Sequence, residues 1–329
     1  MNIFVFGWYG HNNLGDEAFR KSFEYLWGDK ATFTFASKIP QNINEYDACF
    51  VGGGSFLDQE IPGLIKVSIP LGFIGVGIHS HIHPINSFIL KQSKIIITRG
   101  DIFSEQYTKN PQNQFIASDL VFARDIKQEQ NINQNLIPSL PDNNVILIIG
   151  NEFLTPKRNS PIWKYTSFHW FLTEFSKLCD EWVDQEYSIK FYPMCTGDKF
   201  DDRFFASHVV SQMEKHKNVF FHFGHADEDE LIQNISQSKL VVSMRFHGNI
   251  FSTILGKPFI GINSHDKMKT YFNTLRTNNF LDYYGFTSST FRECAENNKI
   301  EPSYLLEYAS KEKDRWHYLS DIVAETFAM

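Results

Sequence analysis

The sequence has few cysteines and no pattern among them. Its four cysteines are Cys49, Cys179, Cys195 and Cys294, with no C-x-x-C pair and no spacing typical of a zinc site. Widely scattered single cysteines are typical of proteins whose thiols stay reduced. Free cytosolic thiols are therefore predicted, and neither a disulfide framework nor a structural zinc is expected.

The sequence also lacks an excess of positive charge. It contains 31 lysines and arginines against 38 aspartates and glutamates, so its formal net charge is -7. A protein that binds nucleic acid needs a basic face to neutralise phosphates. Nucleic acid is therefore not an expected partner, and any anionic ligand must meet a local cluster of basic residues.

Long uninterrupted hydrophobic runs are absent as well. The most apolar long segment, residues 61–78, is broken by two prolines, four glycines and Lys66, so a membrane span is not predicted. The first ten residues carry no basic leader, and their apolar run is too short for a signal peptide. No export and a cytoplasmic location are expected, while peripheral contact with a membrane stays open.

What the sequence does contain is a repeated alternation of short apolar runs and longer amphipathic segments. This is the pattern of β-α-β units around parallel sheets. Residues 125–144 lose the periodicity and collect Asn, Gln and Pro, which predicts a linker. Strands are predicted at residues 2–7, 31–36, 47–54, 71–78 and 93–100 before the linker, and at 145–150, 187–194, 218–224, 239–244 and 258–262 after it.

The predicted fold is α/β, with two Rossmann-like, doubly wound parallel-sheet domains facing a cleft. The first domain is expected at residues 1–135, the second at 143–301, and one long amphipathic helix at 302–329. Hydrophobic residues make up 42% of the chain, which is enough to build two cores. Ligands of such sheets bind beyond the carboxyl ends of the strands, so functional residues are expected in the loops there.

Two glycine-rich segments follow strands of the first domain. The segment GWYGHNNLGDEAF leads into a helix start that favours anions, but its spacing matches neither G-x-G-x-x-G nor a P-loop. Its Asp16 fits helix capping as well as catalysis. Gly53 and Gly54 end a buried strand, and form either a plain tight turn or a cleft lining whose N–H groups hold an oxyanion or a sugar hydroxyl.

Three histidines alternate in the segment HSHIHP. An extended backbone would place His79, His81 and His83 on one face, where they could bind a metal. No partner carboxylates accompany them, so no metal is predicted, and contact of one histidine with a sugar is the preferred alternative.

Basic residues follow two further strands. Arg99 ends the strand at 93–100, and it either pairs with Asp101 or points at an anion in the cleft. Lys157 and Arg158 follow the first strand of the second domain, as solvated loop charges or as anion ligands. Both groups stand at the ligand-facing ends of strands by topology, which makes them candidates for a binding site.

The strongest candidate site lies in the segment SMRFHGNIFSTILGKPFIGINSHDK, residues 243–267. Arg245 and His247 follow a strand and enter a helix whose N-terminus adds partial positive charge, and Lys267 follows the next strand. Three cationic or protonatable groups at neighbouring strand ends predict an anion site, because unpaired charge is costly to bury. The alternative is a salt bridge to an acid elsewhere in the chain.

The succession of these motifs resembles the polysaccharide pyruvyl transferase family. The likeness rests on GWYGHNNLGDEAF, DACFVGGGSFLD, GVGI, TRGDIFS and above all on residues 243–267, with a strand, Ser-x-Arg-x-His, a helix, Gly-x-Pro, a strand and a lysine. It extends over about residues 7 to 269. Phe246 stands where leucine is common in the family, and Gly100 separates Arg99 from Asp101, which many members have adjacent.

The resemblance implies a GT-B-like fold and transfer of pyruvate from phosphoenolpyruvate to a sugar as a ketal, in polysaccharide biosynthesis. His247 is then the candidate for acid–base catalysis, and Arg245 for holding phosphate or carboxylate. The second domain would bind phosphoenolpyruvate and the first the acceptor sugar, without a cofactor or metal. Candidate substrate-binding residues are Arg158, Lys267, Arg99, Gly53, Gly54, Asn13 and Asp16.

Two other functions fit the same fold. One is a GT-B glycosyltransferase with a nucleotide-sugar donor. Glu293 and Glu301 have the eight-residue spacing of retaining members, but the glycine-rich loop expected before the helix is missing from the sequence. The other is a non-catalytic sugar-phosphate binding protein, since fold does not fix function. Neither the acceptor sugar nor the oligomeric state follows from the sequence.

Overall fold

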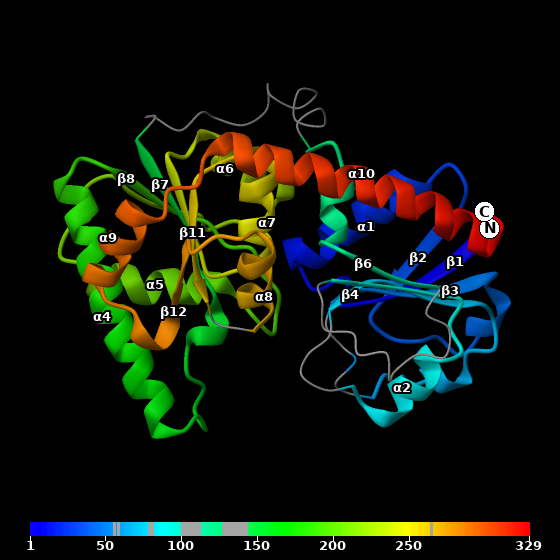
Figure 1. The fold of residues 1–329 in the computed structure, drawn as a ribbon. Coiled ribbons are helices and arrows are strands. Elements are labelled where there is room, and N and C mark those ends of the chain that lie inside the picture. Colours follow the sequence, from blue (N-terminus) through cyan, green and yellow to red (C-terminus); the bar gives the residue numbers. More distant parts are fainter. Residues whose placement is uncertain (55–56, 58–59, 78–81, 100–112, 127–143, 264–265) are drawn as a thin grey trace. The chain divides into compact units, whose positions relative to one another are not determined.

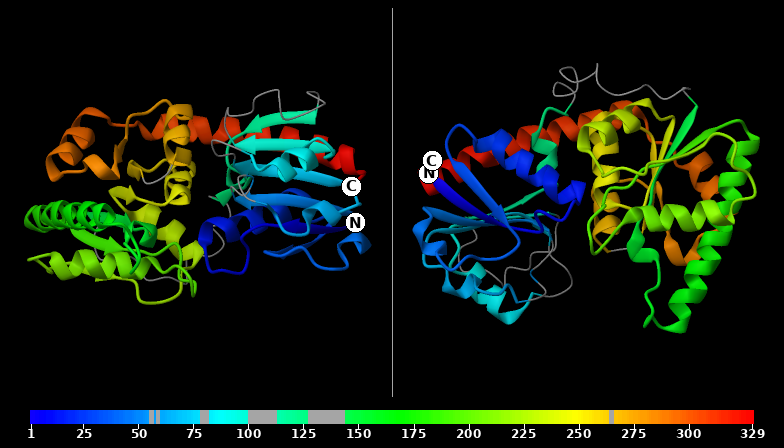
Figure 2. Two further views of the ribbon diagram at one scale, coloured as in Figure 1. Left: turned by 90° about the horizontal axis from the view of Figure 1, so that it is seen from below. Right: turned by 180° about the vertical axis from the view of Figure 1, so that it is seen from behind.

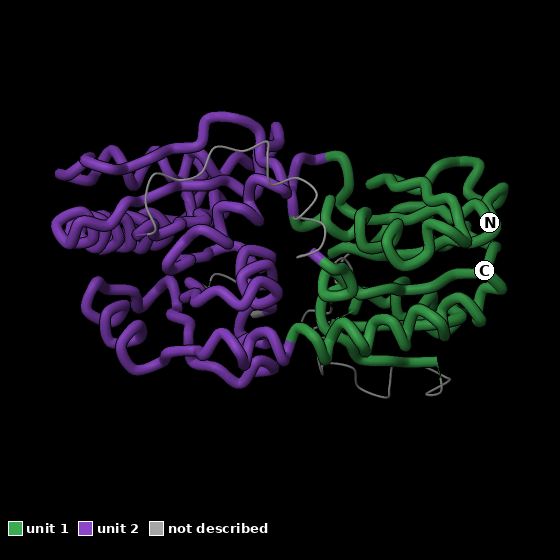
Figure 3. Tube along the Cα trace, turned by 90° about the horizontal axis from the view of Figure 1, so that it is seen from above, with its two compact units in different colours: residues 1–10, 15–125, 309–329 green, residues 11–14, 126–308 purple. Residues whose placement is uncertain are grey.

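The computed structural model describes the chain except residues 55–56, 58–59, 78–81, 100–112, 127–143 and 264–265. The described residues form two six-stranded parallel sheets with helices on their faces (Figure 1). They divide into two compact units, shown in Figure 3. Unit 1 comprises Met1–Gly10, Gly15–Asp125 and Ala309–Met329, and unit 2 comprises His11–Leu14 and Ile126–Tyr308. The prediction of two doubly wound α/β sheets is confirmed.

The sheet of unit 1 has the strand order β2-β1-β3-β4-β5-β6, so its winding reverses between β1 and β3. Nearly all residues of β3 and β4 are buried, which requires cover on both faces. Helices lie above and below these strands accordingly (Figure 1). The elements are β1 (Asn2–Phe6), α1 (Leu14–Trp27), β2 (Thr32–Ala36), η1 (Ile43–Glu45), β3 (Ala48–Gly54), η2 (Leu64–Lys66), β4 (Leu71–Gly77), α2 (Pro84–Leu90), β5 (Ile95–Arg99), β6 (Gln114–Ala117) and η5 (Leu120–Ala123).

The sheet of unit 2 has the order β12-β11-β10-β7-β8-β9, with the reversal between β7 and β10. The five-residue strand β7 is buried along its whole length. The elements are β7 (Val145–Ile149), η6 (Glu152–Leu154), α4 (Ile162–Asp184), β8 (Ser188–Phe191), α5 (Asp202–Gln212), β9 (Val219–Phe221), α6 (Glu228–Gln237), β10 (Leu240–Ser243), α7 (Phe246–Leu255), β11 (Phe259–Asn263), α8 (Asp266–Thr274), β12 (Phe280–Asp282), η7 (Tyr283–Gly285) and α9 (Ser288–Asn297).

The two faces of the unit 2 sheet pack against different helices. Ile148 lies in a core cluster with Phe171 and Phe175 of α4 and Phe205 of α5. The next residue, Ile149, points to the opposite face, where the close approach of Gly248 brings α7 onto the sheet. Figure 2 shows α4 running beside the strands on the first of these faces. The turn from β10 into α7 is therefore fixed by close packing.

The last helix, α10 (Pro302–Phe327), belongs to both units. Its first residues lie in unit 2, where the Tyr304 hydroxyl donates to the Leu275 carbonyl at 3.0 Å. From Ala309 onward it belongs to unit 1. There the Phe327 ring contacts that of Phe50 in β3, with centroids 4.8 Å apart. The predicted long C-terminal helix exists, and its second half completes the core of the N-terminal sheet.

The sequence predicted neither a membrane-spanning helix nor a disulfide. No helix among the described residues is both long and apolar enough to cross a membrane. All four cysteines are free, as predicted, and the structure shows that all four are buried. The strands β6 and β12 were not predicted, because their four and three residues lie outside a longer apolar run, whereas the equally short β9 lies within the aromatic run of residues 218–224.

Candidate active site

The candidate site starts where β10 ends and α7 begins. Arg245 is the N-cap residue of α7, and the hydroxyl of Ser243 accepts from its backbone N–H at 3.3 Å and donates to its carbonyl at 2.8 Å. Helix α7 comes so close to the strand that a Cβ on Gly248 would lie 2.3 Å from the Ser243 hydroxyl oxygen. The backbone that carries Arg245 and His247 is thus held rigidly at the carboxyl end of the sheet.

The Arg245 guanidinium forms an ion pair with a buried carboxylate. Its Nε lies 3.1 and 3.0 Å from the two carboxylate oxygens of Asp202, and its Nη2 also donates to Asp202. Asp202 is 1% exposed and begins α5. The salt bridge that was the alternative for this cluster is therefore present. The salt bridge uses Nε and Nη2 of Arg245 and does not use Nη1.

The Asp202 carboxylate also accepts hydrogen bonds from backbone N–H groups of two neighbouring loops. One of its oxygens accepts from the N–H of Glu152, after β7, at 3.1 Å. The other accepts from the N–H groups of Met194 and Cys195, after β8, at 3.1 and 2.9 Å. A buried carboxylate with this many donors has its hydrogen-bonding capacity satisfied. Through these hydrogen bonds and its ion pair with Arg245, Asp202 connects the ends of β7, β8 and β10.

Aromatic rings lie against the cations of the site. The Arg245 guanidinium carbon is 5.3 Å from the ring centroid of Phe153, which contacts the Phe200 ring at 4.2 Å. Lys157 Nζ lies 4.7 Å from the Phe200 centroid. Cation–π attraction therefore holds Arg245 and Lys157 on the same pair of rings. Arg158, the predicted neighbour of Lys157, is exposed to solvent.

A second aromatic ring gathers the other two predicted residues. The ring of Phe246 meets the ring of His247 edge-on at 5.3 Å, and Lys267 Nζ lies 5.5 Å from its centroid. Tyr271 closes the far side of Phe246 at 5.6 Å. His247 is half-buried, whereas Lys267 is exposed. The structure thus places His247 and Lys267 against one ring, while the Arg245 side chain contacts Asp202 and Phe153.

Residues 11–14 of the N-terminal loop belong to unit 2. The N–H of Leu14 donates to the Met194 carbonyl at 2.9 Å, and the N–H of Thr196 to the Asn12 carbonyl at 3.1 Å. Asn13 forms an antiparallel bridge with Cys195 between these bonds. Asn13 had been placed in the first domain by sequence. It is instead fixed to the loop that Asp202 holds.

The remaining candidates of the N-terminal part lie in unit 1. Arg99 donates to the buried carboxylate of Asp119 at 2.6 Å and to the carbonyl of Gly54 at 3.1 Å. Asp101, the partner that the sequence suggests for Arg99, lies outside the described part of the chain. Gly53 has φ +71, and a Cβ there would lie 2.9 Å from the Tyr9 hydroxyl oxygen, so glycine is required.

The first turn of α1 carries Asp16, which is 8% exposed. Next to it, Tyr9 is buried and its hydroxyl donates to the Gly52 carbonyl at 3.0 Å. Burial raises the pKa of Tyr9 well above its usual value, and the negative charge of Asp16 adds to this rise. Tyr9 therefore stays a neutral hydrogen-bond donor that fixes the glycine turn.

The histidine triplet offers no metal site among the described residues. His83 caps α2, because its Nδ1 accepts from the N–H of Ile85 at 3.4 Å. His79 and His81 lie outside the described residues. No group of His, Cys, Asp or Glu with an arrangement suited to a metal occurs in the part of the chain that the structure describes.

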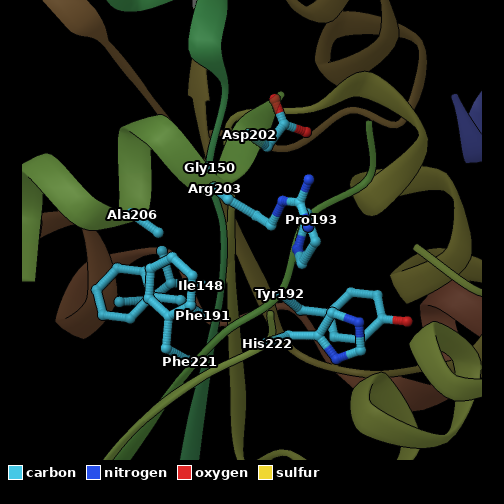
Figure 4. Close-up of a pocket in the computed structure, with 10 residues that line it drawn as sticks. All are labelled: Ile148, Gly150, Phe191, Tyr192, Pro193, Asp202, Arg203, Ala206, Phe221 and His222. Carbon is cyan, nitrogen blue, oxygen red and sulfur yellow. The ribbon is translucent and has the colours of Figure 1, made fainter. Parts of the chain in front are cut away.

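A small pocket lies beside Asp202 in unit 2, between the ends of β7, β8 and β9 (Figure 4). It has room for about one water molecule. Two of its polar residues have partners within the protein: Arg203 contacts Asp201 at 2.5 Å, and Nδ1 of His222 lies 3.2 Å from Glu230. The pocket therefore belongs to the framework that orients Asp202, and it does not hold a ligand of the size of phosphoenolpyruvate.

Sequence reasoning missed Asp202 and Asp119, the two partners of the candidate arginines. Each begins a helix or stands just before one, where an aspartate is explained by capping. Two aspartates in a row, Asp201 and Asp202, were the available signal, since a single cap needs only one. Phe153 and Phe200 gave no signal in a chain with 32 phenylalanines.

The fold is shared with solved structures of low sequence identity. UDP-GlcNAc 2-epimerase from Neisseria meningitidis, bound to UDP-GlcNAc, is 13% identical over the whole of both chains with a TM-score of 0.56. S. aureus MnaA with UDP is 10% identical, with 90% of this chain and 86% of that chain covered and a TM-score of 0.58. The glycotransferase of kitacinnamycin is 8% identical, with 99% and 98% covered and a TM-score of 0.53. At these identities the likeness shows the fold alone, which is GT-B-like as predicted.

The family follows from the sequence match. The model of the polysaccharide pyruvyl transferase family matches residues 5–266, most of the 329 residues. The chain therefore belongs to the polysaccharide pyruvyl transferase family, as the succession of motifs predicted. A search of curated proteins gave no match.

Proposed function

We propose that the protein transfers pyruvate from phosphoenolpyruvate to a sugar of a glycan or polysaccharide, forming a ketal and releasing phosphate. The observation that carries the proposal is the cluster of Arg245, His247 and Lys267 at the carboxyl end of the unit 2 sheet, in a member of this family. Although the chain has a net charge of -7, it carries these cations at the sheet edge where doubly wound sheets bind ligands.

The donor needs several cations at once. Phosphoenolpyruvate carries a phosphate and a carboxylate, and arginine suits both because its planar donors match two oxygens. In the proposal Arg245 holds one of these groups, aligned by Asp202 as a positioning residue. Lys267 and Arg158 assist, and Lys157 lies close enough to the same rings to contribute.

The chemistry requires one proton donor and a base. Protonation of the methylene carbon makes the central carbon electrophilic, and a sugar hydroxyl adds to it and loses its proton. Phosphate then leaves, and a second hydroxyl closes the ketal with loss of another proton. We assign the acid–base work to His247, because an imidazole exchanges protons near neutral pH. Asp16, Gly53, Gly54 and Arg99 of unit 1 are the proposed acceptor-side residues, and Asn13 is a proposed substrate-binding residue of unit 2.

The test is a comparison of donors. The full chain is incubated with phosphoenolpyruvate or with a nucleotide sugar, plus a panel of glycans, and phosphate, nucleotide and glycan mass are followed. Phosphate release that depends on a glycan, with a pyruvyl group gained, supports the proposal. Nucleotide release would instead indicate the GT-B glycosyltransferase that the structural likeness allows. Binding without release of either would indicate a non-catalytic protein.

The cellular location is part of the same proposal. The donor is a small cytoplasmic metabolite, so the reaction is expected in the cytoplasm, with no cofactor or metal. Fractionation of cells with an antibody against the chain would check this location. Recovery outside the cytoplasm and its membrane would contradict it.

A further inference from the structure

The beginning of α4 exposes a group of large apolar side chains. Ile162 is 84% exposed, Trp163 56% and Trp170 53%. Tyr284, 66% exposed, lies beside Trp163 with ring centroids 6.1 Å apart. Trp163 and Trp170 are two helical turns apart, so they share one side of α4. Single exposed apolar residues are normal, but an adjacent group of them marks an interaction surface.

This surface is built on a rigid support. The other side of α4 carries Phe171 and Phe175 into the unit 2 core. The indole N–H of Trp170 donates to the Phe286 carbonyl at 3.1 Å, and the Tyr165 hydroxyl donates to the Lys157 carbonyl at 2.6 Å. The exposed side chains therefore belong to an ordered, well-anchored helix, and their exposure is not the result of a frayed end.

The same segment is locally basic. Residues 157–170 contain Lys157, Arg158 and Lys164 and no aspartate or glutamate, which gives three positive charges against none. The whole chain, in contrast, has a net charge of -7. An acid-free run beside exposed tryptophans is therefore a departure from the general composition, and it complements an anionic partner.

We propose that this α4 surface, made of Lys157, Arg158, Ile162, Trp163, Lys164 and Tyr284, docks onto an anionic lipid bilayer. Tryptophan and tyrosine favour the boundary between headgroups and acyl chains, and lysine and arginine pair with headgroup phosphates. A basic segment gains affinity from each such residue near an anionic membrane. The inference goes beyond the proposed reaction. It shares Lys157 and Arg158 with the proposed donor side, so the test changes Ile162, Trp163 and Lys164, which have no part in that site.

A bilayer fits these residues better than a glycan or a protein does. The most exposed member, Ile162, has neither a flat ring for a sugar nor a polar group, and only an apolar medium can bury it favourably. A protein partner would have to combine acidic residues with an apolar groove of matching shape, whereas an anionic bilayer offers both without shape matching. An anionic headgroup layer over an apolar interior satisfies both features together.

The position of the surface relates it to the candidate site in the same unit. Helix α4 follows β7, and Tyr284 follows β12, so both lie toward the carboxyl end of the sheet, as do Arg245 and Lys267. Figure 1 shows the N-terminal end of α4 extending beyond the strands at this end. A bilayer bound there would face the edge of the sheet that carries the cations.

Vesicle flotation of the full chain tests the proposal. The chain is mixed with vesicles of phosphatidylcholine alone or of phosphatidylcholine with about one third phosphatidylglycerol, at low and high salt. We expect binding to the anionic vesicles, weakened by salt. The double variant Ile162→Asn/Trp163→Ser should lower the affinity at least about tenfold, and Lys164→Gln about fivefold. Phe88→Ser, an equally exposed aromatic residue on α2 of unit 1, is the matched control and should change nothing.

Absence of flotation for the unaltered chain would overturn the proposal, as would equal binding by the double variant or an equal loss in Phe88→Ser. Retention on immobilised glycan that only the double variant loses would identify a glycan surface instead. Phosphate release with a soluble glycan is measured in parallel. If the reaction is wrong, release is absent while flotation persists; if the docking is wrong, flotation is absent while release persists. Circular dichroism of each variant shows whether it is folded.

Discussion

Two arginines, one in each unit, make the same contact and have different surroundings. Arg99 ends β5 and pairs with Asp119; Arg245 follows β10 and pairs with Asp202, and both aspartates are buried. Arg99 otherwise contacts the Gly54 carbonyl and the ring of Phe19. Arg245 lies over the ring of Phe153, and the adjacent ring of Phe200 carries Lys157.

The difference lies in what each aspartate holds. Asp119 caps the short helix η5 by accepting from Val121 N–H at 3.1 Å, so it stabilises one turn. Asp202 holds backbone groups from two other loops besides its arginine. An arginine at a strand end is therefore not a functional residue by its ion pair alone. The assembly of several loops and cations around one of the two pairs distinguishes the candidate site.

The largest expected effect comes from removing the proposed acid–base group. His247→Ala should lower kcat for phosphate release about 10²- to 10⁴-fold, the usual contribution of general acid–base catalysis. Steady-state phosphate release measures it. His216→Ala, an exposed histidine of the same unit, serves as control and should retain activity. If His247→Ala and Arg245→Ala both kept the activity of the unaltered chain, the site assignment would be wrong even with the family correct.

The comparison of the two ion pairs is tested by Asp202→Asn against Asp119→Asn. Each variant leaves a buried arginine without its carboxylate and should lower the free energy of unfolding by about 3 kcal/mol. Asp202→Asn should also lower kcat at least about tenfold, because it misplaces Arg245. Denaturant titration and phosphate release, normalised to folded protein, separate the two effects. An equal loss of kcat in both variants would show that the pairs do not differ in function.

A smaller effect is expected from the ring that gathers His247 and Lys267. Phe246→Leu removes the cation–π contact with Lys267, which is worth about 0.5–1 kcal/mol at an exposed site. The KM for phosphoenolpyruvate should rise about two- to fivefold with little change in kcat. Phe223→Leu, at a ring 79% exposed in the same unit, is the control. A lower KM in Phe246→Leu would contradict a role of this ring in donor binding.

The smallest expected effect is the protection of two buried thiols, one in each unit, from thiol reagents. Burial raises the pKa of Cys49 in unit 1 to about 12, and burial also raises the pKa of Cys179 in unit 2. Both should resist thiol reagents at pH 8 in the native state, since the thiolate is the reactive form. Mass spectrometry after pulsed labelling in denaturant identifies which unit opens first. Rapid native labelling of either cysteine would contradict its burial.

The sign of the pH effect follows from the same raised pKa. The neutral Cys49 thiol is favoured in the folded state, so its contribution to stability is fully present below the unfolded pKa of about 8.5. It is lost progressively as the pH rises toward the folded pKa of about 12. Cys49→Ser should flatten this alkaline loss of stability. Denaturant titrations between pH 8 and 10 measure it.

Much of the fold could be predicted because the signals are local. Buried parallel strands are continuous apolar runs of Val, Ile, Leu and Phe, and β7, with the sequence VILII, was found from that pattern alone. The edge strand β12 has three residues and no longer apolar run around it, unlike the equally short β9, so it gave no signal. The domain that contains residues 11–14 could not be predicted, because their contacts with Met194, Cys195 and Thr196, far along the chain, assign it.

The sequence by itself determined the two parallel sheets, the long last helix and the places of Arg245, His247 and Lys267 at strand ends. These features follow from hydrophobic periodicity and from the topology of parallel sheets, which send successive strand ends to one edge. Only the tertiary structure decided that Asp202 and Asp119 are the partners of the arginines, and that α10 completes the first sheet. Those contacts join residues distant in sequence, and a single aspartate or aromatic residue carries no local signal of its partner.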